Sequence, residues 1–179
     1  MSFKDIFNID AEVKESAHAR VNLIGEHTDY TGGYVMPTLL SFKNTIEISQ
    51  NNSNEFTVYS QHFKEKKTFN DFKKSINNEW VDYIKGCLHI FFDENKISSR
   101  FLSIFISSDI PLERGISSSS ALCVATLKAL NTFFETKIKD PEIAKLAKKV
   151  EFNYIGVSGG IMDQMVSSIG IHGKAFFMN

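Results

Sequence analysis

The most informative stretch of the sequence is a run of four serines, Ser117 to Ser120. The run follows Gly115 and leads directly into residues 121–134, whose apolar side chains recur at helical spacing. Hydroxyls and free backbone N–H groups at the start of a helix, together with the positive end of the helix dipole, bind anions. The run therefore predicts a phosphate-binding loop. A flexible serine-rich linker is the alternative, and the helical periodicity that follows argues against it.

A second group of polar residues, Glu26, His27 and Asp29, follows the strand-like residues 16–25 and precedes the glycine pair at 32–33. Two carboxylates and an imidazole on a short loop at the end of a strand suit a small polyhydroxylated ligand, whose hydroxyls need fixed partners. Their spacing matches no zinc pattern. A polar turn without a ligand is the alternative.

A third candidate is Asp163, which lies at the start of a predicted helix behind Gly159 and Gly160. Glycines allow a ligand or another backbone segment to approach closely, although an aspartate here also serves simply as a partner of the helix dipole. Glu151, on the helix before, supplies a second carboxylate, and Arg20 a cation. Two acids, an arginine and a phosphate loop are the groups with which proteins position and neutralise a transferring phosphoryl group.

Strands early in the chain and helices later must position these residues. Without an alternating strand–helix rhythm, this order predicts an α+β fold. The pattern predicts helices near 2–9, 80–92, 121–134, 141–154 and 162–169, strands at 16–25, 101–107 and 174–179, and a hairpin formed by 45–49 and 56–59.

Composition restricts the class of protein. The chain has 179 residues, 42% of them hydrophobic, with 20 Lys+Arg against 21 Asp+Glu. That length supports one domain with its own core, and the balanced charge argues against nucleic acid as a partner. No apolar run reaches the ~20 residues of a membrane span, and no signal peptide is evident. Cys87 and Cys123 are expected to be buried thiols in a reducing compartment, which predicts a cytoplasmic protein.

Three segments together resemble the motifs of galactokinases in the GHMP kinase superfamily. They are Arg20–Tyr30 with Gly33–Pro37, the serine run, and Gly160–Gln164, and they occur in the family's order. The resemblance implies one α+β domain over 1–179, of the ribosomal protein S5 domain 2-like type that forms the N-terminal domain of GHMP kinases. Within it would lie a galactose-recognition segment (16–37), a phosphate-binding loop and helix (111–135) and a catalytic segment (159–170). Galactokinases are about twice as long, so their C-terminal domain is absent from this sequence.

The resemblance also implies a role for each site residue. Asp163 would accept the proton of the sugar's anomeric hydroxyl or orient that hydroxyl, and Arg20 would keep Asp163 ionised and stabilise the phosphate in transfer. Glu26, His27, Asp29 and Gly160 would bind the sugar. Gly115, Ser117, Ser118, Ser119 and Ser120 would bind the ATP phosphates, with Trp80 near the adenine or, equally, a core anchor of its own helix. Ser119 and Glu151 would hold Mg²⁺.

The implied reaction is transfer of phosphate from MgATP to galactose, giving galactose 1-phosphate. The alternatives are a GHMP kinase for arabinose, N-acetylgalactosamine or galacturonate, or a chain that binds sugar or nucleotide without catalysis. A C-terminal half or a second copy of the chain would be the protein partner. The sequence departs from the family at His18-Ala19, where a Pro-Gly is usual, at Thr31, where an asparagine is usual, and at Glu113-Arg114, where small residues are usual.

Overall fold

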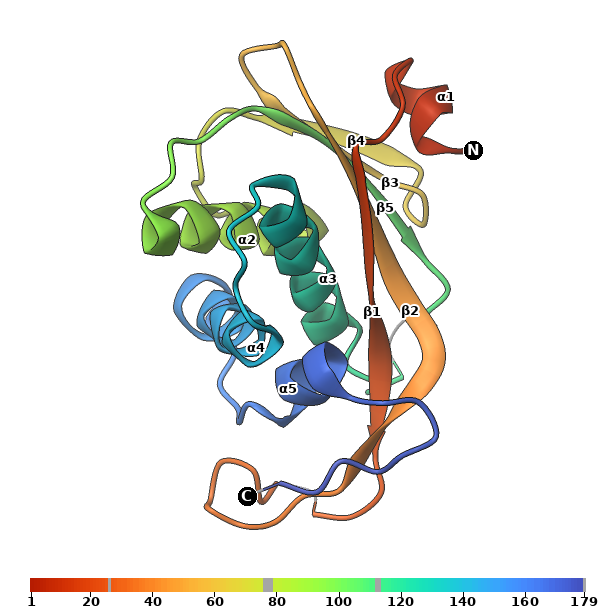
Figure 1. Ribbon diagram of the computed structural model, residues 1–179, viewed down its shortest axis with the longest axis vertical. Helices are drawn as coiled ribbons and strands as arrows, with labels where there is room; N and C mark the ends of the chain where they lie inside the picture. Colours follow the sequence, from red (N-terminus) through yellow and green to blue (C-terminus); the bar gives the residue numbers. More distant parts are fainter. Residues whose placement is uncertain (26, 76–78, 112–113, 179) are drawn as a thin grey trace.

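A computed structural model describes residues 1–25, 27–75, 79–111 and 114–178. A five-stranded sheet in the order β1-β2-β5-β3-β4 carries most of the helices on one face (Figure 1). The elements are α1 (Phe3–Phe7), β1 (Val13–Asn22), β2 (Pro37–Gln50), β3 (Phe56–Ser60), β4 (Glu65–Phe69), α2 (Trp80–Asn95), β5 (Leu102–Ser108), α3 (Ser118–Phe133), α4 (Asp140–Lys149), the π-helix η1 (Val150–Ile155) and α5 (Met162–Ile169).

The sheet is mixed, which confirms the α+β class. All neighbouring strands are antiparallel except β3 and β5, which run parallel and are connected through β4 and α2. The predicted hairpin is wrong, because β5 lies between β2 and β3. Residues 51–54 do form a turn, in which the Asn51 side chain donates to the carbonyl oxygen of Glu55 (3.1 Å). That turn ends β2 without pairing it with β3.

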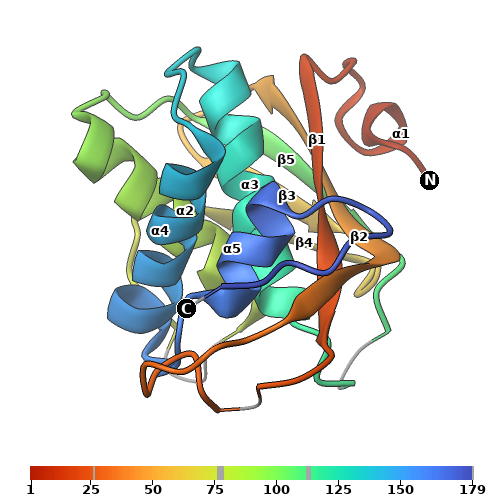
Figure 2. The ribbon, with the colours of Figure 1, turned by 60° about the horizontal axis from the view of Figure 1, so that its bottom comes forward.

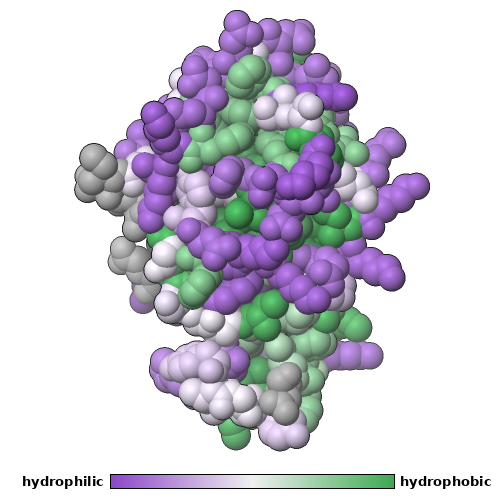
Figure 3. All heavy atoms as spheres, turned by 90° about the vertical axis from the view of Figure 1, so that its left-hand side faces the viewer, coloured by the Kyte–Doolittle hydropathy of each residue, from purple (hydrophilic) through white to green (hydrophobic). Residues whose placement is uncertain are grey.

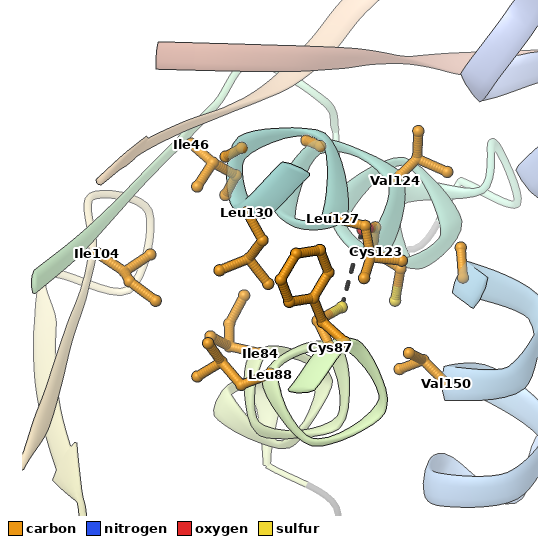
Figure 4. Close-up of a cluster of buried hydrophobic side chains, with 14 of the residues drawn as sticks. Ile46, Ile84, Cys87, Leu88, Ile104, Cys123, Val124, Leu127, Leu130 and Val150 are labelled. Carbon is orange, nitrogen blue, oxygen red and sulfur yellow. Dashed lines mark hydrogen bonds between the residues drawn. The ribbon is translucent and has the colours of Figure 1, made fainter. Parts of the chain in front are cut away.

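The main core lies between the sheet and helices α2 and α3 (Figure 4). Ile46 and Ile104 of the sheet meet Leu88 of α2 and Leu130 of α3, and all four side chains are fully buried. Burying each such side chain contributes about 1.5–3 kcal/mol. Cys87 and Cys123, predicted as buried thiols, are indeed buried and unpaired, and the Cys87 thiol donates to the carbonyl oxygen of Cys123 (3.8 Å).

The helix-bearing side of the molecule is largely hydrophilic, with hydrophobic groups visible between the polar ones (Figure 3). On the opposite face of the sheet, α1 covers Tyr59 and Phe105 with the buried ring of Phe3. Among the helices of the described residues, none combines the length and hydropathy needed to cross a membrane.

The segment after α5 leaves the helical side and passes across β1 and β2 (Figures 1 and 2). The predicted strand over 174–179 is reduced to two isolated bridges, Thr38 with Ala175 and Val35 with Met178, and residue 179 lies outside the described residues. A histidine pair also holds this segment, since Nε2 of His172 lies 3.1 Å from Nε2 of His18 on β1. The sequence analysis did not foresee this pair.

Protonation is expected to break the histidine pair. Nδ1 of His18 faces the carbonyl oxygen of Leu40 (3.1 Å) and must carry a hydrogen, so its Nε2 is the acceptor for His172. Burial lowers the pKa of His18 below its usual 6.5, and the charges of His172 and Lys43 lower it further. The unfolded chain therefore takes up the proton first, so stability falls as the pH drops below about 6.5 and stops falling below the folded-state pKa.

The expected result is a lower melting temperature at pH 5.5 than at pH 7.5, measured by circular dichroism. The variant His18→Asn places its amide nitrogen at the position of Nδ1, so it keeps a donor for the Leu40 carbonyl but cannot titrate, and it should lose less between the two pH values. An equal loss in both proteins would show that the histidine pair does not cause the pH dependence.

Candidate functional site

Arg20 and Asp163 form the centre of the candidate site. Arg20 lies near the end of β1 and Asp163 in the first turn of α5, 143 residues later. Arg20 donates two hydrogen bonds to the carboxylate, from Nε (2.6 Å) and Nη2 (2.8 Å), and the hydroxyl of Ser117 donates to the same carboxylate. Such a bidentate pair fixes both groups in one plane. The structure thus brings together the two residues that the sequence analysis predicted to be catalytic.

The loop before α3 forms one wall beside this pair. Nη1 of Arg20 donates to the carbonyl oxygen of Gly115 (3.0 Å), and Gly115 and Ser117 both adopt positive φ (65° and 58°). The predicted loop serines are partly helical, since Ser118, Ser119 and Ser120 form the first turn of α3. A hollow lined by Arg20, Asp163 and the loop therefore lies at the positive end of a helix. Arg114 also lines it, whereas Glu113 lies outside the described residues.

Glu151 is the second acid of the site and is almost fully buried, at 5% exposure. It is the second residue of η1, the π-helix that continues α4. Its carboxylate accepts hydrogen bonds from Ser119 (2.9 Å), from Ser120 (2.8 Å) and from the amide of Gln164. No Lys or Arg of the described residues forms an ion pair with it. Glu151 is thus a buried carboxylate held by neutral donors.

The polar loop after β1 forms another wall of the site, through His27, Asp29 and Tyr30. The Thr28 hydroxyl donates to the carbonyl oxygens of Gly25 (2.7 Å) and Tyr34 (2.9 Å), which holds the turn together. Asp29 lies directly against Gly160, because a Cβ at position 160 would overlap the Asp29 carboxylate. Glu26, predicted in the same group, lies outside the described residues.

These segments line one common cavity of about 240 Å³. The predicted residues that line it come from all three motifs: Arg20, His27, Asp29, Ser119, Ser120, Glu151, Gly160 and Asp163. Gly115, Ser117 and Ser118 line the adjoining hollow beside Arg20.

Trp80 lies elsewhere, in a separate apolar cavity of about 230 Å³. Its indole stacks on Phe63, with ring centroids 5.8 Å apart, and its N–H donates to Glu65 (2.9 Å). Ser118 and Ser119 also line this cavity, so the start of α3 borders both it and the site at Arg20. Trp80 therefore both packs beside its own helix and forms part of a cavity wall.

Several residues that line the main cavity had no role assigned in the sequence analysis, among them Tyr30, Lys148 and Gln164. The Tyr30 hydroxyl lies 2.8 Å from Nδ1 of His27. Lys148 is three residues before Glu151, a spacing that places two residues on one helix face. The tertiary contact of Lys148 and the burial of Gln164 appear only in the fold, so spacing alone could not assign either residue to the site.

Comparison with known proteins gives consistent matches. A model of the GHMP kinases N-terminal domain matches residues 82–170, and a model of the galactokinase galactose-binding signature matches residues 1–50. A galactokinase of Pyrococcus furiosus is 37% identical over 94% of this chain and 47% of the relative. A galactokinase of Fusobacterium nucleatum is 34% identical over 99% of this chain and 47% of the relative.

Solved structures agree with the sequence matches. The crystal structure of Lactococcus lactis galactokinase complexed with galactose superposes with a TM-score of 0.88 at 30% identity, over 97% of this chain and 46% of that one. Methanococcus jannaschii mevalonate kinase superposes with a TM-score of 0.79 at 26% identity, over 87% of this chain and 50% of that one. The chain spans about half the length of the relatives it matches.

Proposed function

Because the chain belongs to the GHMP kinases and carries the galactose-binding signature of galactokinases, we propose that it forms the catalytic N-terminal part of a galactokinase-type sugar kinase. The reaction is transfer of the γ-phosphate of ATP to the anomeric hydroxyl of galactose. The observation that carries this proposal is the Arg20–Asp163 pair, which lies where the cavity lined by Asp29 and Gly160 meets the hollow before α3. A sugar hydroxyl and a phosphate bound on the two sides would meet at this pair.

Each member of the pair has a distinct part in this reaction. The Asp163 carboxylate accepts the proton of the sugar hydroxyl or orients that hydroxyl for attack. The guanidinium of Arg20 keeps the carboxylate fixed and adds positive charge beside the phosphate. Ser117, Ser118 and Ser119 at the start of α3 line the same hollow, and the N–H groups of a first helical turn favour the negative oxygens of a phosphate.

The residues predicted to hold Mg²⁺ fit that ion. Glu151 is a buried carboxylate with no cationic partner among the described residues, and the Ser119 hydroxyl lies 2.9 Å from it. Oε1 of Gln164 is also buried and unpartnered. No group of three His, Cys, Asp or Glu side chains in the described part of the chain could hold a metal. Few carboxylates are typical for Mg²⁺, which uses one or two together with substrate phosphates. Bound there, the ion would neutralise charge on those phosphates.

The apolar cavity around Trp80 is the proposed adenine site. It adjoins the phosphate hollow through Ser118 and Ser119, and its other walls include Phe63, Tyr83 and Leu122. Burial raises the pKa of Tyr83, so its hydroxyl stays neutral at physiological pH and is available as a hydrogen-bond partner.

Calorimetric titration of the chain with galactose tests the proposal, with and without a non-hydrolysable MgATP analogue. We expect both ligands to bind, and a coupled ADP-release assay to show galactose-dependent turnover. A panel with arabinose, N-acetylgalactosamine and galacturonate identifies the sugar, and faster turnover of one of these would contradict galactose as the substrate. Binding without turnover would identify a non-catalytic binding protein, and binding of neither ligand would refute the proposal for this chain alone.

Gly160→Ala is expected to weaken galactose binding by at least about tenfold, since the new methyl group must displace Asp29 and each 1.4 kcal/mol is a factor of ten. Gly159→Ala is the matched control, because a Cβ at position 159 meets nothing within 4 Å. Calorimetry of both variants checks this. Equal affinities would show that the contact between Asp29 and Gly160 does not shape the sugar site.

A further inference from the structure

We propose that Lys148 is a positioning residue for the sugar site: its ammonium group holds the carbonyl of Gly159 and thereby fixes the backbone of Gly160 against Asp29. This inference rests on the proposed function, which places the sugar at Gly160. Lys148 lies in the last turn of α4, and its Nζ donates to the carbonyl oxygen of Gly159 in the loop before α5. Its side chain also lines the cavity.

Lys148 differs from the other lysines near the end of α4. Lys145 pairs with Glu142 and Lys149 with Glu94, each at 2.8 Å. Lys148 forms no ion pair within the described residues, and its ammonium instead lies 5.6 Å from the ring centre of Phe152 and reaches back to the loop. A lysine in a last helical turn ordinarily interacts with the negative end of the helix dipole. Here the side chain links α4 to a segment that lines the sugar side of the cavity.

The loop needs such a link because its own packing is weak. Open space surrounds Gly159 on the side where a Cβ would lie, and two consecutive glycines have wide backbone freedom. Gly160 nevertheless contacts Asp29 closely enough to leave no room for a methyl group. The Lys148 hydrogen bond acts on the residue directly before that contact. It therefore restricts the loop at the point where a small displacement would open the wall formed by Gly160 and Asp29.

Two variants and a control test this role. Lys148→Met keeps the aliphatic stem over Phe152 but removes the donor, Lys148→Arg keeps a cationic donor, and Lys149→Met removes a neighbouring lysine outside the cavity. Nitrogen-15 relaxation of the ligand-free chain reports the order of the Gly159 and Gly160 amides, and calorimetry reports the affinity for galactose. We expect order parameters of about 0.85 in the parent chain and below about 0.6 in Lys148→Met.

The affinity for galactose should fall about tenfold in Lys148→Met, which corresponds to 1.4 kcal/mol, and recover in Lys148→Arg. Lys149→Met should leave both quantities unchanged, and all melting temperatures should agree. Unchanged order of the loop in Lys148→Met would overturn the proposal, as would a disordered loop that binds galactose with full affinity. If the parent chain binds no galactose, the proposed function fails, while the relaxation data still decide whether Lys148 fixes the loop.

Discussion

Galactose phosphorylation is expected to fall about 10³-fold when Asp163 is replaced by asparagine, a loss within the 10²–10⁴ range of general acid–base catalysis. The amide has nearly the shape of the carboxylate but cannot accept the proton of the sugar hydroxyl. It also disturbs the pair with Arg20, because one amide position now carries hydrogens that face the donors of Arg20 or Ser117. Both effects act on the transferring groups rather than on the sugar's other hydroxyls. The affinity for galactose should therefore change much less than turnover.

The coupled ADP-release assay at saturating galactose checks this prediction. Asp93→Asn is a suitable control, since Asp93 is an exposed carboxylate on α2 that pairs only loosely with Lys96 (3.7 Å). That variant should keep full turnover. Turnover of Asp163→Asn within tenfold of the parent chain would mean that Asp163 does not take part in the proton transfer. Calorimetry on the same samples separates a defect in catalysis from a loss of binding.

The sequence identified the chemical groups of the site better than their arrangement. Strand and turn signals predicted that Arg20 lies in a strand and that Asp163 lies at the start of a helix, and both predictions hold. Nothing local indicates that the two side chains meet, because the contact spans 143 residues and depends on where α5 packs beside β1. The family resemblance supplied that pairing, and the geometry now supports it.

The wrongly predicted hairpin has a similar cause, because a local pattern does not identify the tertiary partner of a strand. Alternation along 45–49 and 56–59 identifies two strands, but alternation carries no information about the partner of a strand. The central strand β5 is buried from Leu102 to Ile106 and forms hydrogen bonds with both β2 and β3. It therefore separates the two strands that the hairpin would have paired. The π-helix after α4 was also missed, since its residues continue the apolar periodicity of an ordinary helix until Gly156.

Lys148 shows a different limit of sequence reasoning. Lysines at 145, 148 and 149 look alike in the sequence, because all three are polar residues of one predicted helix over 141–154. Only the fold distinguishes them, because the chain returns toward α4 at Gly159, whose carbonyl oxygen accepts a hydrogen bond from Lys148. The function of a surface lysine thus depends on a tertiary contact that spacing cannot reveal.

Glu151→Ala is expected to lower the free energy of unfolding by about 2–4 kcal/mol. The carboxylate accepts three hydrogen bonds, from Ser119, Ser120 and Gln164, and its removal leaves these buried donors unpaired beside a new cavity. Each such bond to a charged group contributes about 1.5–3 kcal/mol. The cost of burying a charge without a cationic partner opposes this gain, so the net loss should be smaller than the sum.

Glu151→Gln separates the structural role from the proposed role in holding Mg²⁺. The amide keeps one acceptor oxygen, the serine hydroxyls can turn to accept from its N–H₂ group, and the cost of burying a charge disappears. Stability should therefore stay within about 1 kcal/mol of the parent chain. Turnover should fall about 10²-fold, since a neutral amide is a weaker ligand for a hard cation than a carboxylate.

Urea unfolding and the coupled assay at several Mg²⁺ concentrations check both variants. Glu142→Ala serves as the control, because Glu142 is an exposed glutamate of α4 whose pair with Lys145 (2.8 Å) should contribute little. If Glu151→Ala is as stable as the parent chain, the hydrogen-bonded cluster does not stabilise the fold. If Glu151→Gln keeps the same turnover and Mg²⁺ requirement, the ion binds elsewhere and Glu151 has only a structural role. The combination of a stable amide variant and an impaired Mg²⁺ response is the result that the proposed site requires.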